Sequence, residues 1–191
     1  MIGIMLGLAL QSATPEPPIN APVGPLRGLI SAFDSVCNQG FPDDERVASA
    51  MSRVPTMKPL TLDQLRIYLK DDPGRGWITD DGSIVITIES PPFHACAVRM
   101  LKTAGALDEV MWRAVINAAE IRAGGGFMPM PPQGFVVGDS RTTVVGDQKI
   151  NPDGSAEAFY LMRTAPVDQA KAKIHGVELR LVRQIVSTGA R

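Results

Sequence analysis

Apolar residues recur at helical spacing just beyond residue 24 of the chain. From Pro25 they return every three or four positions until Gly40, which predicts one helix with an apolar stripe. The stripe consists of Leu26, Leu29, Ile30, Phe33, Val36 and Cys37. Cys37 therefore falls on the helix face that we expect to be buried.

Two more helices are predicted before residue 75. The segment 42–53 begins with acidic residues, which the positive end of a helix dipole favours, and its expected buried stripe is Val47, Met51 and Val54. The segment 61–72 begins with Thr61 and Gln64 at the spacing of a capping box. We expect Leu62, Leu65 and Leu69 to face the core from this helix.

The pattern changes from helical to alternating at Trp77. The segments 77–79 and 84–88 predict a hairpin closed by Asp81 and Gly82 in a two-residue primed turn. The next apolar run, 93–100, predicts a third strand. Alternation places His94, Cys96, Val98 and Met100 on one face of that strand.

The second half of the chain combines one long helix with several strands. The segment 106–123 has an apolar face formed by Leu107, Val110, Met111, Ala114, Ala118 and Ile121, which Trp112, Val115 and Ala119 broaden. Its charged residues, Glu120 among them, are expected to face solvent. Strand character follows at 135–137, 142–145, 155–163 and 177–186. The chain therefore predicts an α+β fold with a helical amino-terminal half and a mainly antiparallel sheet, on which the long helix packs.

The first 24 residues divide into an apolar run and a proline-rich segment. Residues 1–10 are uninterruptedly apolar, which is typical of an export signal and about half of the roughly 20 residues that a membrane-spanning helix needs. No Lys or Arg precedes this run, and of the three residues that follow it only Ser12 and Ala13 are small. The alternative is a buried terminal strand or helix, which the prolines of residues 14–25 would detach from the core. We expect a signal peptide at 1–13, a linker at 14–24 and a single α+β domain at 25–191. The product would then be periplasmic or secreted, without stable membrane insertion after cleavage.

Charge and composition narrow the classes of partner. The formal net charge is −1, and no basic cluster stands out along the chain, so we expect no nucleic-acid binding. Aromatic residues make up only 5% of the sequence, which disfavours a surface that stacks against sugars or bases. We expect no cofactor.

The two cysteines, Cys37 and Cys96, allow three interpretations. An export signal and two core-facing positions favour a disulfide between them. The second interpretation is a hydrolase or thiol enzyme in which Cys96 or Cys37 is the nucleophile and His94 or His175 is the base. However, Cys37 lies near the carboxyl end of its helix, where the dipole opposes a thiolate. A metal site is the third, but neither histidine has a partner at ligand spacing, so we assign no metal.

The loop 124–134 is the best candidate for a binding segment. Three glycines allow mobility, and Phe127, Met128 and Met130 could form an adaptable apolar contact surface for a protein partner or a small ligand. The alternative is a helix cap followed by a proline-stiffened connection whose apolar residues pack into the core. Another candidate, an anion site formed by Arg163, Arg180 and Arg183, competes with the simpler interpretation that these are solvated strand positions.

The sequence thus favours an exported, disulfide-stapled binding or structural protein of the bacterial envelope type. No complete catalytic constellation is evident in the sequence, so we expect a non-enzymatic role. The cysteine- and histidine-dependent enzyme remains the alternative from another class.

Overall fold

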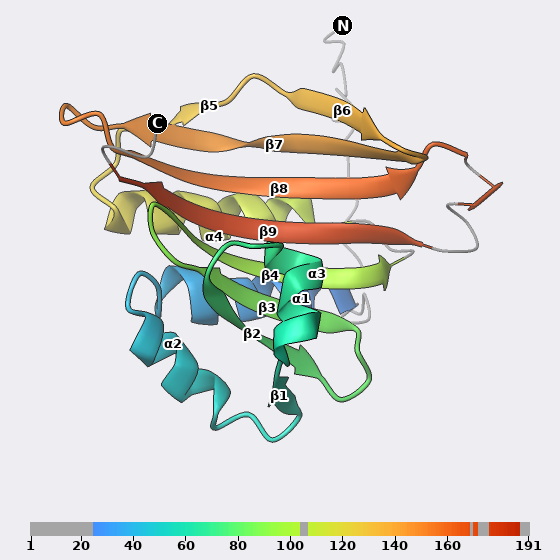
Figure 1. The fold of residues 1–191 in the computed structure, drawn as a ribbon. Coiled ribbons are helices and arrows are strands. Elements are labelled where there is room, and N and C mark those ends of the chain that lie inside the picture. Colours follow the sequence, from blue (N-terminus) through green and yellow to red (C-terminus); the bar gives the residue numbers. More distant parts are fainter. Residues whose placement is uncertain (1–24, 104–106, 169, 172–175, 188–191) are drawn as a thin grey trace, which may run out of the picture.

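A computed structural model describes residues 25–103, 107–168, 170–171 and 176–187. These residues form one antiparallel sheet with strand order β1-β2-β3-β4-β9-β8-β7-β5, in which β6 also pairs with β7 (Figure 1). The strands are β1 (Met57–Pro59), β2 (Gly74–Thr79), β3 (Ile84–Glu89), β4 (Phe93–Thr103), β5 (Met128–Pro129), β6 (Gln133–Val137), β7 (Ser140–Ile150), β8 (Ala156–Pro166) and β9 (Val177–Val186). The helices are α1 (Pro25–Phe33), the π-helix η1 (Asp34–Asn38), α2 (Asp44–Met51), α3 (Leu62–Leu69) and α4 (Glu109–Arg122). The predicted α+β class is confirmed. The predicted signal peptide and linker lie outside the described residues.

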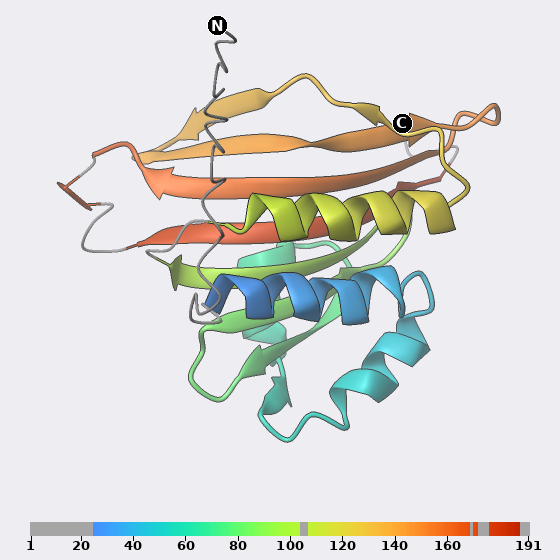
Figure 2. The same cartoon turned by 180° about the vertical axis from the view of Figure 1, so that it is seen from behind.

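Two helices lie side by side on one face of the sheet, which we call the helix-covered face (Figure 2). The Arg27 side chain near the start of α1 pairs with Asp108 at the start of α4, and Asp34 after α1 pairs with Arg122 at the end of α4. Since equivalent ends meet, α1 and α4 run parallel. Their apolar sides join the sheet in the core.

The helix α3 lies on the opposite face, which we call the open face because α1 and α4 leave it uncovered (Figure 1). Its approach depends on two glycines of β2. A Cβ added to Gly76 would lie 3.1 Å from Leu65 Cδ2, and one added to Gly74 would lie 2.6 Å from Leu69 Cδ1. The alternating glycines thus make room for the apolar side of α3.

The first helix and β4 are joined by the disulfide between Cys37 and Cys96, as the sequence predicted. The two Cα atoms are 5.4 Å apart, and both cysteines are fully buried. The helix widens into the π-helix η1 in the turn that carries Cys37. In the chain-entropy model, a crosslink that closes a loop across 59 positions stabilises the fold by roughly 4 kcal/mol.

The buried side of α4 is centred on the residues that broaden the predicted face rather than on its predicted centre. Trp112, Ile116 and Ala119 are its buried residues, whereas Val110 is 82% exposed and Ile121 is 77% exposed. Apolar residues surround most of this helix, so periodicity alone does not select one stripe. The stripe with the bulkier Trp112 packs on the sheet, and this rotation brings Glu120 to a half-buried position instead of into solvent.

Several local expectations are also corrected. Val54 and Leu62 are exposed, because α2 ends at Met51 and only the later turn of α3 reaches the sheet. A type I′ turn needs a positive φ at both central residues and a type II′ turn needs one at the first, yet of Asp81 and Gly82 only Gly82, the second, has one. Asp81 instead accepts hydrogen bonds from Thr79 and Ser83.

No helix among the described residues combines the length and the apolar character needed to cross a membrane.

Candidate functional site

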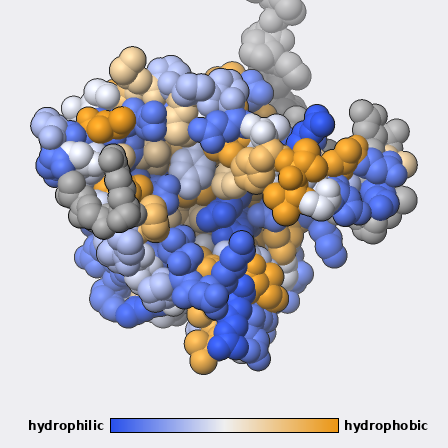
Figure 3. Space-filling view, turned by 45° about the horizontal axis from the view of Figure 1, so that its top comes forward, coloured by the Kyte–Doolittle hydropathy of each residue, from blue (hydrophilic) through white to orange (hydrophobic). Residues whose placement is uncertain are grey.

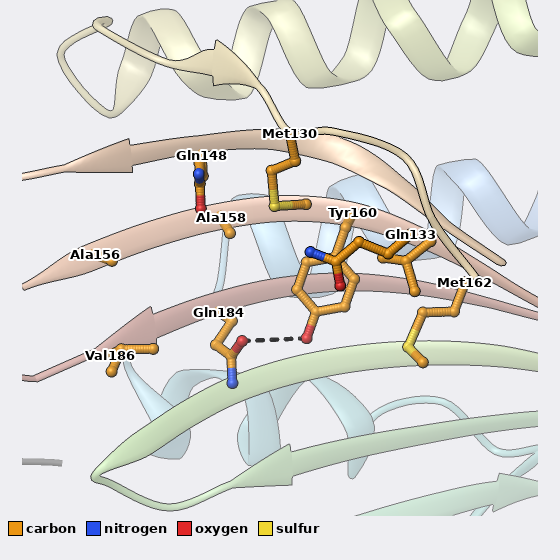
Figure 4. A pocket seen from close by; sticks show the side chains of 10 residues that line it. Met130, Gln133, Gln148, Ala156, Ala158, Tyr160, Met162, Gln184 and Val186 are labelled. Atoms are coloured by element: carbon orange, nitrogen blue, oxygen red, sulfur yellow. Dashed lines mark hydrogen bonds between the residues drawn. The ribbon is translucent and has the colours of Figure 1, made fainter. Parts of the chain in front are cut away.

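The three apolar residues of loop 124–134, the predicted binding segment, lie in different environments. Phe127 packs against Phe159 of the core, with 5.3 Å between ring centroids. Met128 is 70% exposed in β5. Met130 is half-buried and extends over the open face of the sheet, where it lines a pocket (Figure 4). Phe127 therefore packs into the core, whereas Met128 and Met130 remain at the surface.

The pocket lies between the 130–133 segment and the open face of β7, β8 and β9, and has a volume of about 310 Å³. Its lining is formed by Met130, Gln133, Val144, Gln148, Ala156, Ala158, Tyr160, Met162, Gln184 and Val186. Ala156 and Ala158 of β8 form the floor of the pocket, and their small side chains leave it deep. Tyr160 and Met162, on the same face of β8, have larger side chains that extend above this floor. Gly146 opposite Tyr160 is essential to this arrangement, because a Cβ there would lie 2.6 Å from Tyr160 Cα.

Polar groups converge at one side of this mainly apolar pocket. The Tyr160 hydroxyl donates a hydrogen bond to Gln184 Oε1 at 3.2 Å (Figure 4). Burial raises the pKa of Tyr160 above its usual value, so the phenol stays protonated at neutral pH. An apolar lining with a few convergent polar groups is the usual composition of a small-molecule site.

Arg180 lies beside the pocket on the open face and Arg99 lies one strand farther away, and neither lines the pocket. Arg180 is the register partner of Met162, and Arg99 is the register partner of Arg180 on the next strand. Arg99 is only 6% exposed, donates from Nη2 to the Tyr68 carbonyl at 3.2 Å, and lies 5.1 Å from the centre of the Tyr68 ring. Burial and the positive charge of Arg180 lower the pKa of Arg99 to about 10.

The anion site expected from Arg163, Arg180 and Arg183 does not form. Strand alternation sends Arg180 to the open face, whereas Arg163 and Arg183 belong to the helix-covered face. Arg183 forms an ion pair with Glu157, in which both side chains are 13% exposed. It also donates to the carbonyls of Cys37, Asn38 and Phe41 after α1. Its role is therefore structural.

The cysteine and histidine candidates lie together but do not form a nucleophile and base. Both sulfurs are in the disulfide, so neither Cys37 nor Cys96 presents a thiolate. His94 Nε2 lies 2.8 Å from Asp44 Oδ1, and its ring packs edge-on against Phe41. These contacts join α2 to β4. His175 lies outside the described residues.

The part of the chain that the structure describes contains no group of three or more histidine, cysteine or acidic side chains placed to hold a metal ion.

Sequence reasoning missed Arg99 as part of the site. The signal was a single charged residue inside the apolar run 93–100, on the face opposite Cys96. Tyr160 and Gln184 could not be found in the same way, because their proximity depends on the pairing of β8 with β9.

An exposed apolar strip follows the 130–133 segment along the chain. Edge strand β6 exposes Phe135, Val136 and Val137. Figure 3 shows apolar residues gathered towards this end of the sheet. None of these three residues lines the pocket.

No protein-family model, curated protein or solved structure matches this chain.

Proposed function

We propose that this protein is a non-enzymatic binding protein that holds a small ligand in the open-face pocket beneath the 130–133 segment. The observation that carries the proposal is the pocket itself, about 310 Å³ in volume, with an apolar floor and the Tyr160 and Gln184 polar groups at one side. This volume is at the lower end of the roughly 300 to 1,000 Å³ of small-molecule pockets. The ligand is therefore small.

We also propose that the protein is exported and acts in the periplasm or outside the cell. The apolar residues 1–10 followed by small residues support this location. A fully buried disulfide supports it as well, because disulfides persist mainly in oxidising compartments. Fractionation of the expressing cell, with mass measurement of the product, tests cleavage near Thr14.

The binding proposal is tested with a neutral apolar probe, N-phenyl-1-naphthylamine, whose fluorescence rises in apolar surroundings. Ala158→Trp places a large side chain on the pocket floor, whereas Val145→Trp places the same side chain at an exposed position on the opposite sheet face. We expect the wild type and Val145→Trp to bind the probe and Ala158→Trp to lose binding. Equal binding by both variants would exclude this pocket as the site.

The protein-partner alternative is favoured by the exposed apolar residues of β6. An unpaired strand edge can accept another strand. A pull-down from an envelope extract with the wild type and Val136→Lys tests it: a partner captured only by the wild type would support this role.

A further inference from the structure

We propose that the ligand of this pocket carries a carboxylate, which extends past Met162 to bind Arg180 beside the pocket, with Arg99 behind it as a second positive charge. The inference rests on the proposed function, because it identifies the chemical class of the ligand in the same pocket. It predicts a small molecule with one anionic group on an apolar body.

The strand register places the arginines beside the pocket. Arg99, Arg180 and Met162 are consecutive partners across β4, β9 and β8, and their side chains share the open face. Directly opposite residues on one face of an antiparallel pair have Cβ atoms about 4.5 to 5.5 Å apart. Since Met162 lines the pocket, Arg180 is the next side chain beyond its wall.

Both arginines retain hydrogen-bonding capacity. The Nε atoms of Arg99 and Arg180 are buried and have no hydrogen-bond partner among the described residues. Buried polar groups without a partner are rare, because each costs the free energy of its lost hydration. For Arg180 only Nε is enclosed, and its terminal Nη groups make no hydrogen bond or ion pair among the described residues. These Nη groups are the donors that an acceptor supplied from outside the chain can reach.

Acidic residues on the same face do not neutralise the pair by contact. Glu89 and Glu178 attract the arginines, yet neither forms an ion pair with Arg99 or Arg180 within the described part of the chain. Burial and the charge of Asp72 raise the pKa of Glu89 despite the attraction of both arginines. Glu89 therefore attracts the arginines from a distance, in competition with a ligand carboxylate, but does not form an ion pair with either of them.

The geometry suits a carboxylate on an apolar body. A guanidinium presents a planar fork of N–H donors that matches the two oxygens of a carboxylate. The aliphatic part would contact Val144 and Met162, which are register partners at this end of the pocket. The positive end and the apolar lining thus select an amphipathic anion over a neutral apolar molecule.

Calorimetric titration of the purified protein with octanoate and with 1-octanol tests the inference. The two probes share a chain length and differ in charge. Arg180→Gln removes the proposed contact, while Arg163→Gln removes one exposed positive charge from the opposite face. Glu89→Gln removes the competing carboxylate. Circular dichroism of each variant establishes that it is folded.

We expect octanoate to bind the wild type about 10-fold more tightly than octanol, the usual effect of a hydrogen bond to a charged group. Arg180→Gln should abolish this preference, Arg163→Gln should retain it, and Glu89→Gln should increase it. Equal affinities of the two probes for the wild type would overturn the carboxylate inference and leave the binding pocket supported. Failure of both probes to bind at millimolar concentration would contradict both proposals. Retention of the preference by Arg180→Gln would overturn the assignment to Arg180.

Discussion

Arg99 of β4 and Arg180 of β9 lie opposite each other on the open face of the sheet, and each has a buried Nε without a hydrogen-bond partner among the described residues. Arg183, on the other face of β9, is the contrasting case. Its Nε donates to Glu157 at 2.8 Å, and its guanidinium lies between the rings of Phe41 and Phe159. Strand β9 therefore carries Arg183, whose Nε is hydrogen-bonded and whose role is structural, and Arg180, whose guanidinium has no hydrogen-bond partner among the described residues.

This contrast predicts different stability effects for two arginine substitutions. Arg183→Met leaves Glu157 buried without its partner, so we expect a loss of about 3 to 5 kcal/mol in the free energy of unfolding. Arg99→Met removes a buried charge that repels Arg180 and loses one hydrogen bond to Tyr68, worth about 1 kcal/mol. We therefore expect Arg99→Met to cost about 1 kcal/mol at most. Urea denaturation measures both variants, and equal large losses would show that Arg99 is also structural.

The disulfide predicts that the stability of the protein depends strongly on whether Cys37 and Cys96 are oxidised or reduced. Reduction of the bond between Cys37 and Cys96 should lower the free energy of unfolding by roughly 4 kcal/mol. Chemical denaturation with and without reductant measures this loss. Alkylation of the native, unreduced protein should label neither cysteine, since both sulfurs are bonded. Ready labelling of both thiols would contradict the structure and revive the thiol-enzyme interpretation.

The raised pKa of Glu120 predicts a contribution to the free energy of unfolding that decreases as the pH rises. Burial, with the charge and hydrogen bonding of Asp147, raises the pKa of Glu120 above 4.5 in the folded protein. The folded state therefore holds this proton more tightly than the unfolded chain, and stability falls as the pH increases from about 4.5 through the raised pKa.

The matched variant for this effect is Glu120→Gln, which keeps the shape of the side chain and removes its titration. We expect it to be more stable than the wild type near pH 7, with a smaller difference near pH 4. Denaturation midpoints across this range measure the effect. Parallel pH profiles of the two proteins would argue against a raised Glu120 pKa.

The docking of α3 predicts opposite effects for two glycine substitutions. A Cβ at Gly74 would overlap the Ile88 carbonyl and crowd Leu69, so Gly74→Ala should destabilise the protein by about 1 to 3 kcal/mol. A Cβ at Gly28 in α1 would meet nothing within 4 Å, so Gly28→Ala should stabilise by about 0.5 to 1 kcal/mol. Thermal unfolding distinguishes the two signs. Tolerance of Gly74→Ala would mean that α3 does not depend on close contact with β2.

The sequence was most informative where one periodicity dominated. Helical spacing placed Cys37 and strand alternation placed Cys96 on buried faces, and the disulfide between them is confirmed. The capping box of Thr61 and Gln64 is also confirmed, because its hydrogen bonds are local.

Prediction failed where tertiary packing had to choose between alternatives. On α4, two apolar stripes compete, and contact with the sheet selects Trp112 and Ile116 over Val110 and Ile121. The pocket could not be predicted either, because strands β7, β8 and β9 bring Gln148, Tyr160 and Gln184 together from segments far apart in the sequence. Arg99 was visible as a charge in an apolar run, but its partner Arg180 follows only from the β4–β9 register.

Nuclear magnetic resonance of the arginine side-chain N–H groups during octanoate titration tests the central claim most directly, because it observes the guanidinium groups themselves. We expect the Arg180 Nη–H signals to move downfield as they gain an acceptor, and the Arg183 Nε–H signal, already bonded to Glu157, to remain in place. An unchanged Arg180 signal at saturating octanoate would contradict ligand binding at the open-face arginines.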